Sequence, residues 1–382
     1  MRTKFLTLAS ACAFTALAAT TTVPAAADPR PAPTVPVHLY GGAWPTSHVQ
    51  GVVVDRKKGY VYYSFTTMLV KTDLKGTVVG TVEGLTGHLG DLDQNPDDGR
   101  VYGSLEYKEA EAFYIAIFDV DKITRVGMDA EQDDVMTTVY LREVVEDFTA
   151  DMDGNGVFDG NVADTPDHRY GSSGIDGVSF GPELGKRNPD NRLMVAYGIY
   201  TNLERTDNDH QVLLEYDVRR WARYERPLSQ TAPHHSGPRK SPDKFFVHTG
   251  NTHFGVQNLE YDSYTGNWMM AVYEGQKPEF PNYSLFMVDG DAKPRRGVLE
   301  GQPGGERGTI LPLLPYGLYD PATGIHGWES EGNYGLESLG DGTYYIAEGA
   351  AVTEDGVPKQ DANLTLHYWT GETPTPFRPF TP

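Results

Sequence analysis

A short strand pattern recurs five times along the chain. Each copy starts near a glycine or histidine and continues with an apolar stretch, and most copies add a turn rich in Asp and Gly and a second stretch with aromatic residues. The copies start at positions 48, 88, 174, 255 and 335, and the first reads HVQGVVVD, followed by GYVYY. Alternation with a period of two, turn glycines and aromatic strand ends are typical of β-strands. A strand unit repeated in this way predicts an all-β fold, the β-propeller.

The spacing of the copies predicts the number of blades. Equivalent positions in successive copies lie 40, 86, 81 and 80 residues apart. One interval near 40 and three near twice that length indicate seven steps around a closed ring, and therefore a seven-bladed β-propeller. A five-bladed propeller with long insertions is the alternative. Little helix is expected, apart from a short piece over residues 139–148.

Residues 1–27 have the layout of a secretory signal peptide. Arg2 and Lys4 precede an apolar stretch, and three alanines follow at positions 25–27. The apolar stretch is short for a membrane span, and no later segment is long and apolar enough to be one. We therefore expect a secreted, extracellular monomer, with a proline-rich leader over residues 28–36 and a single propeller domain over residues 37–382.

The chain is strongly acidic, with 32 Lys and Arg against 53 Asp and Glu and a formal net charge of −21. This balance argues against nucleic acid and against anionic membranes as partners, because both attract basic surfaces. A small cleft for an anionic substrate stays compatible with it. The only cysteine, Cys12, lies in the predicted signal peptide, so disulfide and thiolate chemistry are excluded from the mature chain.

The equivalent positions of the copies are mostly polar. The innermost strand of a propeller blade starts near the central axis, so these side chains should meet there. Ca²⁺ prefers such oxygen ligands, and the alternative is hydrogen bonding to neighbouring blades. The candidate metal ligands are Gln50, Asp176, Gln257 and Glu337. Two positions earlier, His48 and His88 should lie at one mouth of the same funnel.

A second calcium candidate is the segment DMDGNGVFD at residues 151–159. Its acidic and amide positions match the first part of an EF-hand loop, with a glycine at the sharp turn. The acidic residue expected at position twelve is missing, since Val162 stands there. An Asp-rich turn without metal is the alternative. The candidate ligands are Asp151, Asp153, Asn155 and Asp159. No organic cofactor is expected.

The densest polar cluster is DHRYGSSGID at residues 167–176. Its glycines would allow the backbone to approach a ligand closely. Arg169 offers the planar fork that suits a carboxylate, and a surface ion pair is the alternative. Nucleophile-elbow, phosphate-loop and zinc-protease motifs are absent from the sequence. Further candidates are Glu106, Tyr107, His168, Arg205, His253 and Tyr334.

Several longer segments resemble one family of secreted propeller enzymes. They start at positions 48, 84, 99, 169 and 280 and read HVQGVVVD with GYVYYSFTT, GLTGHLG, GRVYGSLEYK, RYGSSGIDGV and FPNY. The family comprises rhamnosyl-α-1,4-glucuronate lyases, which remove L-rhamnose from D-glucuronate on arabinogalactan proteins and gum arabic. A related branch consists of α-L-rhamnosidases that use a single histidine on the opposite face.

The resemblance implies β-elimination at glucuronate. The proton on carbon 5 is weakly acidic, so the neighbouring carboxylate must be neutralised. A base removes this proton, and an acid protonates the leaving rhamnose oxygen. His88 and Tyr107 would share the base and acid roles, and Arg169 would hold the carboxylate. The substrate-binding residues would be His48, His168, Arg205, His253 and Tyr334.

Two other functions fit the same residues. A hydrolase of the rhamnosidase branch would activate water with a histidine and leave no double bond in its product. A secreted carbohydrate-binding propeller without catalysis is the second, because a fold does not decide a function. Clustered His, Tyr and Arg at one mouth favour an enzyme.

Overall fold

Antiparallel strands dominate the part of the chain that the structure, a computed structural model, describes: residues 33–187, 189–240 and 242–381. The predicted signal peptide and most of the predicted leader lie outside these residues. Within them, no helix is long and apolar enough to cross a membrane. The all-β prediction is confirmed for the unit that starts at Val35.

Five sheets form the blades of a propeller, and their first strands contact one another around a central axis. The first blade contains β2 (Val49–Asp55), β3 (Tyr60–Phe65), β4 (Met68–Asp73), β5 (Val78–Glu83) and the short β9 (Met128–Asp129). The second contains β6 (His88–Gln94), β7 (Val101–Tyr107), β8 (Ala112–Phe118) and β10 (Met136–Tyr140). The third contains β11 (Ser172–Pro182), β12 (Asn191–Ile199), β13 (His210–Tyr216) and β14 (Asp243–His248), extended by β19 (Arg307–Ile310) and β18 (Arg295–Val298).

The last two blades complete the ring. The fourth contains β15 (His253–Asp262), β16 (Asn267–Tyr273) and β17 (Leu285–Asp289). The fifth contains β22 (Leu336–Ser338), β23 (Thr343–Glu348), β25 (Val357–Trp369) and β1 (His38–Trp44), with β24 (Ala351–Glu354) and β26 (Phe377–Pro379) on β25. The remaining elements are the pair β20 (Leu318–Asp320) and β21 (Ile325–Gly327), the helix α1 (Arg142–Phe148), and 3-10 turns at Lys108–Ala110, Arg169–Gly171, Trp221–Arg223 and Pro303–Gly305.

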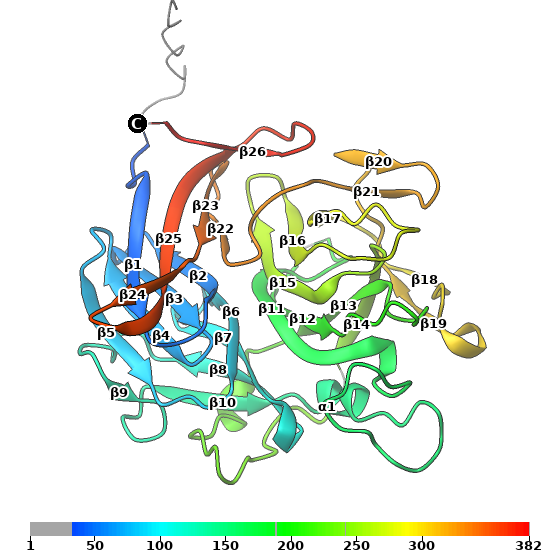
Figure 1. The fold of residues 1–382 in the computed structure, drawn as a ribbon, viewed down its shortest axis with the longest axis horizontal. Helices are drawn as coiled ribbons and strands as arrows, with labels where there is room; N and C mark the ends of the chain where they lie inside the picture. The colour runs from blue at the N-terminus through cyan, green and yellow to red at the C-terminus, as the bar shows by residue number, and fades with distance from the viewer. Residues whose placement is uncertain (1–32, 188, 241, 382) are drawn as a thin grey trace, which may run out of the picture. The chain divides into compact units, whose positions relative to one another are not determined.

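The propeller closes in the fifth blade, where the strand β1 pairs with the late strand β25. β1, in blue, lies beside β25, in red (Figure 1), and the pairing is antiparallel from His38 opposite Thr365 to Trp44 opposite Gln360. The first strand of the chain thus completes a sheet that the last strands build. Ring closure of this kind leaves only short, protected sheet edges.

The predicted count of seven blades is not confirmed, because the structure has five blades in a ring. Each of the five sequence copies supplies one innermost strand: β2, β6, β11, β15 or β22. The long intervals contain insertions instead of additional blades. The interval before β11 holds α1 and the segment 149–171, and the interval before β22 holds β18 to β21. The five-bladed alternative with insertions therefore describes the fold.

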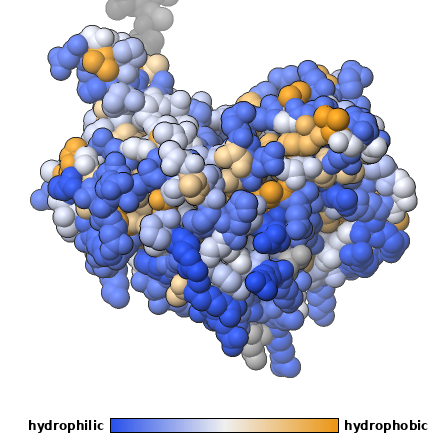
Figure 2. Space-filling view, turned by 90° about the horizontal axis from the view of Figure 1, so that it is seen from below, coloured by the Kyte–Doolittle hydropathy of each residue, from blue (hydrophilic) through white to orange (hydrophobic). Residues whose placement is uncertain are grey.

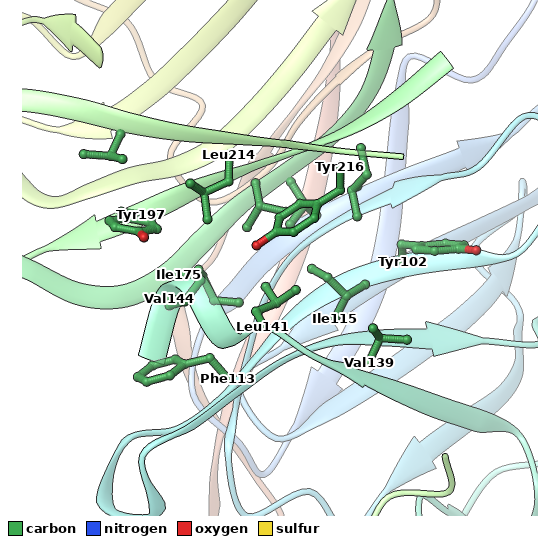
Figure 3. Close-up of a cluster of buried hydrophobic side chains, with 14 of the residues drawn as sticks. Tyr102, Phe113, Ile115, Val139, Leu141, Val144, Ile175, Tyr197, Leu214 and Tyr216 are labelled. Atoms are coloured by element: carbon green, nitrogen blue, oxygen red, sulfur yellow. The ribbon is translucent and has the colours of Figure 1, made fainter. Parts of the chain in front are cut away.

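One apolar cluster joins the second blade, α1 and the third blade (Figure 3). Phe113 of β8 packs against Phe148 of α1 with ring centroids 4.9 Å apart. Val144 and Phe148 are four residues apart, so they share one buried face of the helix. The helix has only seven residues and no side-chain cap at its N-terminus. Its stability therefore comes from this packing.

Carboxylate side chains connect the innermost strands of different blades through hydrogen bonds to backbone N–H groups. Asp91 of β6 is buried, and its Oδ2 accepts hydrogen bonds from the backbone N–H groups of Val178 and Leu259, both at 3.0 Å. It thereby ties the second blade to the third and the fourth. Glu337 Oε1 accepts from the N–H of Val54 at 2.9 Å and ties the fifth blade to the first.

The surface of the described residues is mostly polar on the face in Figure 2. The face in Figure 2 is covered mainly by hydrophilic residues, with hydrophobic residues scattered among them. Phe254, with 48% of its surface exposed, is one of the large apolar side chains that the described surface leaves open.

Candidate functional site

A cavity of about 680 Å³ opens where the innermost strands of the first four blades begin. Neighbouring strands are antiparallel, so the ends of β7, β12 and β16 reach the same face of the ring. The cavity has the size of a typical small-ligand site. Of the predicted residues, it brings together His48, Gln50, His88, Glu106, Tyr107, Asp176 and Gln257.

Lys108, Phe254 and Tyr273 are among the cavity-lining residues that sequence analysis missed. Lys108 follows Glu106 by two positions at the end of a strand, a spacing that places both side chains on one face. Tyr273 ends β16, directly opposite His253 in the fourth blade. Each of the three residues lies beside a predicted residue, either in the sequence or across the sheet. This proximity was the signal that could have identified them.

One wall of the cavity is charged and centres on Glu106. Its buried carboxylate has Oε2 3.5 Å from His88 Nδ1 and 3.3 Å from Lys108 Nζ, and its Oε1 accepts from the N–H of Ile175 at 2.6 Å. Burial opposes ionisation, but the two cations and this hydrogen bond lower the pKa of Glu106 overall. Burial likewise opposes the charge of His88, yet Glu106 and Asp176 raise its pKa. The pair thus favours the ionised form of Glu106 and the protonated form of His88.

Asp176 differs from Glu106 in its surroundings. Its side chain is buried, and among the described residues its Oδ1 has no hydrogen-bond partner. Burial raises the pKa of Asp176 to about 7, with His88 opposing the shift and Glu106 adding to it. Asp176 therefore lines the cavity beside Glu106 and, with this pKa, is only partly ionised near pH 7.

Two glycines make room for these carboxyls. A Cβ at Gly90 would lie 2.2 Å from Asp176 Oδ1, and one at Gly174 would lie 2.0 Å from Glu106 Oε1. Gly174 also has φ +117°, where a side chain is strained. The glycines of the repeat thus allow side chains of neighbouring blades to approach the cavity.

The other wall is aromatic. The hydroxyl of Tyr273 lies 3.4 Å from His48 Nε2, and the ring of Tyr334 packs against both, at centroid distances of 6.0 and 5.0 Å. Burial and the nearby His88 lower the pKa of His48. Burial raises the pKa of Tyr273. The predicted Tyr334 is thus a packing partner of two cavity residues.

Tyr107 lines the cavity, and its hydroxyl donates to Gln230 Oε1 at 2.9 Å. The same oxygen accepts from the N–H and the hydroxyl of Thr86, which also lines the cavity. Burial raises the pKa of Tyr107. Its hydroxyl is therefore held by a residue from the loop that follows β13.

Other predicted residues do not line the cavity. Arg169 forms ion pairs at 3.7 Å with Asp147 and Glu306 and is 41% exposed, which matches the surface alternative. His168 is buried, with its ring nitrogens 2.6 and 3.1 Å from the carbonyls of Phe148 and Val162.

The last two predicted substrate-binding residues have other partners. Arg205 pairs with Asp207 at 2.8 Å and donates to the carbonyl of His168. His253 packs edge-on against Phe254, with ring centroids 4.0 Å apart. Neither residue lines the cavity.

The predicted central metal ligands separate into two groups. Gln50, Asp176 and Gln257 line the cavity, whereas Glu337 is bonded to the first blade. Gln50 Nε2 donates to Thr66 Oγ1 at 3.2 Å, and Gln257 Nε2 donates to the carbonyl of Phe254 at 3.1 Å. For Glu337 the structure matches the alternative of a bond to a neighbouring blade.

The acidic loop folds as a series of tight turns. Asp151 accepts from the N–H groups of Gly154 and Gly156, at 2.7 and 2.8 Å, and Asp153 accepts from the N–H of Asn155 at 2.9 Å. Asp151, Asp153 and Asp167 each bring one carboxylate oxygen within 4.8 Å of the others.

The hydroxyl of Thr165 donates to the predicted ligand Asp159, and Asp167, outside the predicted set, completes the acidic group. Calcium binding by this loop stays a prediction.

Comparison with known proteins concerns the fold. No family model and no curated protein matches the sequence. Among solved structures, the chain is similar to the Dos1 propeller, with 11% identity, a TM-score of 0.34 and coverage of 84% of this chain and 78% of the other. It is also similar to the PQQ domain of pyranose dehydrogenase from Coprinopsis cinerea, with 9% identity, a TM-score of 0.37 and coverage of 82% and 81%. The arrangement of the five sheets around one axis is what gives the chain its β-propeller fold. These findings identify no family.

Proposed function

We propose that the protein is a secreted lyase that removes terminal L-rhamnose from D-glucuronate on arabinogalactan glycans, such as those of gum arabic, by β-elimination. The observation that supports it best is the composition of the cavity. Asp176, with a pKa of about 7, lies with His88 and Lys108 at the charged wall, and His48, with its lowered pKa, lies beside the Tyr273 hydroxyl at the other wall.

The charged wall suits a uronate. Removal of the proton from carbon 5 places additional negative charge on the substrate carboxylate, so donors aimed at it stabilise the transition state. A neutral Asp176 can donate a hydrogen bond there, and Lys108 and His88 supply positive charge. In this proposal Lys108 takes the role predicted for Arg169, because Lys108 lines the cavity.

The aromatic wall supplies a base and an acid. A lowered pKa leaves His48 neutral near pH 7, and a raised pKa keeps Tyr273 protonated. His48 would take the proton from carbon 5, and a double bond would form between carbons 4 and 5. The bond from carbon 4 to the rhamnose oxygen would break as Tyr273 protonates that oxygen. His88, whose pKa Glu106 and Asp176 raise, fits neutralisation better than the base and acid work that it was predicted to share with Tyr107.

Hydrolysis is the second candidate, and one observation favours it. Glycosidases use two carboxyl groups whose environments push their pKa values apart. Glu106, with its lowered pKa, and Asp176, with a pKa of about 7, form such a pair at one cavity.

One assay separates these functions. The purified protein is incubated with gum arabic while free rhamnose and the ultraviolet absorbance of unsaturated uronate are followed together. Rhamnose with rising absorbance supports the lyase, and rhamnose without it supports the hydrolase. If neither signal rises, with or without Ca²⁺, both enzymes are excluded and the carbohydrate-binding alternative takes their place.

The variant Asp176→Asn adds a second criterion. An amide still donates a hydrogen bond to a uronate carboxylate, so a lyase should keep a measurable part of its activity. An amide cannot deliver a proton to a leaving group, so a hydrolase that uses Asp176 as its acid should lose it.

Replacement of Lys108 and replacement of Arg169 are expected to have different effects on activity. Lys108→Ala should lower kcat/KM on gum arabic by about 10²-fold, because it removes positive charge from the site of charge development. Arg169→Ala should change kcat/KM by no more than about twofold, because its ion pairs lie outside the cavity and are partly exposed. Initial rates of rhamnose release measure both. The reverse order would return the carboxylate-binding role to Arg169.

The pH profile of kcat/KM should be bell-shaped with a mildly acidic optimum. Activity requires neutral His48, whose pKa lies below its ordinary value of 6.5, and neutral Asp176, whose pKa is about 7. The rate should therefore fall as pH drops through the first pKa and as it rises through the second. His88→Gln removes a positive charge that favours ionised Asp176, so its alkaline limb should move to higher pH. An unmoved or lowered alkaline limb would contradict this assignment.

A further inference from the structure

Phe254 combines three properties that point to a role in binding. It lines the cavity, 48% of its surface is exposed, and its backbone has φ +67°. A bulky side chain in this left-handed region is strained, and such strain is found mostly at functional sites. Exposure of the apolar Phe254 ring to water is also unfavourable in free energy.

The backbone around Phe254 explains its position. The register between β15 and β16 shifts between His253 and Val256, and this irregularity re-aims the side chain at the start of the strand. Gly255 follows with φ +78°, and a Cβ there would lie 2.5 Å from the carbonyl oxygen of Tyr197 in β12. Close contact between the third and fourth blades thus fixes the chain here. Gln257 secures it further by donating to the Phe254 carbonyl at 3.1 Å.

Phe254 is the exposed end of a row of rings. Its centroid lies 6.4 Å from that of Tyr273, which lies 6.0 Å from Tyr334, and Tyr334 lies 5.0 Å from His48. The first two contacts are edge-on, so the row is rigid without being stacked flat. The cavity therefore has an apolar wall that ends in an open ring, together with the charged residues around Glu106.

A sugar ring matches this arrangement. Pyranoses have C–H faces that pack on aromatic rings and hydroxyl edges that need polar partners, and a 6-deoxyhexose adds an apolar methyl group. We propose that Phe254 is a stacking platform that binds the C–H face of a 6-deoxyhexose next to the charged group of the substrate. This inference rests on the proposed function for the identity of the sugar. Phe254 acts in binding and specificity and takes no part in proton transfer.

The test uses three variants of Phe254. Phe254→Ala should raise KM on gum arabic about tenfold and leave kcat within about twofold, because stacking holds substrate and transition state alike. Phe254→Tyr should restore the wild-type KM. Phe254→Gly should lose binding without a lower Tm, because glycine accepts a positive φ. Tyr264→Ala is the matched control, since Tyr264 is 58% exposed and lies in the turn that follows the opposite end of β15.

A second readout does not depend on turnover. The inactive variant His48→Gln, alone and combined with Phe254→Ala, is tested for retardation in gels that contain gum arabic. Weaker retardation of the double variant supports the platform, even where the wild type releases no rhamnose and the proposed function has failed. Equal retardation of the two, no retardation of either, or a fall in Tm that accompanies the loss of binding, overturns the platform whether or not the enzyme is active.

Discussion

His48→Gln is expected to lower kcat on gum arabic by about 10³-fold, within the range for loss of a general base. The imidazole Nε2 lies 3.4 Å from the Tyr273 hydroxyl, and glutamine keeps a polar group there without a basic nitrogen. KM should change little, because the charged wall and Phe254 stay in place. Steady-state rates of rhamnose release, with Tm as a check on folding, measure the effect.

The matched control is His38→Gln on β1. His38 is an exposed histidine of the fifth blade and does not line the cavity. Its replacement should leave kcat and KM unchanged. If His48→Gln keeps full activity while His88→Gln loses it, the base role belongs to His88, one of the two residues predicted to share base and acid work.

Asp91→Ala is expected to destabilise the fold by about 3–5 kcal/mol, through buried backbone donors left without partners. Asp91 is 2% exposed. It accepts from the N–H of Leu92 at 2.9 Å, of Val178 at 3.0 Å and of Leu259 at 3.0 Å. The variant would leave these donors buried and would release contacts between three blades. Urea denaturation of wild type and variant, followed by fluorescence, measures the free energy of unfolding.

Two further variants serve as comparisons for the Asp91→Ala variant. Asp91→Asn keeps an acceptor oxygen in place and should cost less than Asp91→Ala. Asp97→Ala, on the exposed turn after the same strand, should change the free energy of unfolding by less than about 0.5 kcal/mol. An Asp91→Ala variant as stable as Asp97→Ala would mean that these hydrogen bonds do not hold the blades together.

The five-copy repeat could be recognised in the sequence because each strand pattern spans only a few neighbouring residues. All five copies found in the sequence became innermost strands, since alternation and turn glycines act within a few residues. The number of blades could not be predicted from such short patterns. An interval of 80 residues holds either two blades or one blade with insertions, and this depends on whether segments such as 149–171 find a sheet to join. In the structure, this segment contains no strand.

The site was predicted in part for the same reason. Strand starts converge on the axis of a propeller, so His48, His88 and Asp176 meet although 128 residues separate the first from the last. Arg169 could not be placed this way. Its partners Asp147 and Glu306 come from α1 and from the segment before β19, and nothing in the local sequence marks them.

The sequence by itself therefore determined the strands, the glycines that let blades approach, and the polar groups that start the innermost strands. Only the tertiary structure decided the charge states and the open surface of the cavity. The pKa of Asp176 rises to about 7 because folding buries it beside a second carboxylate from another blade. Phe254 is exposed because the close contact of β15 with β12 fixes its backbone. Both effects depend on distances between segments far apart in the chain, which a local pattern does not contain.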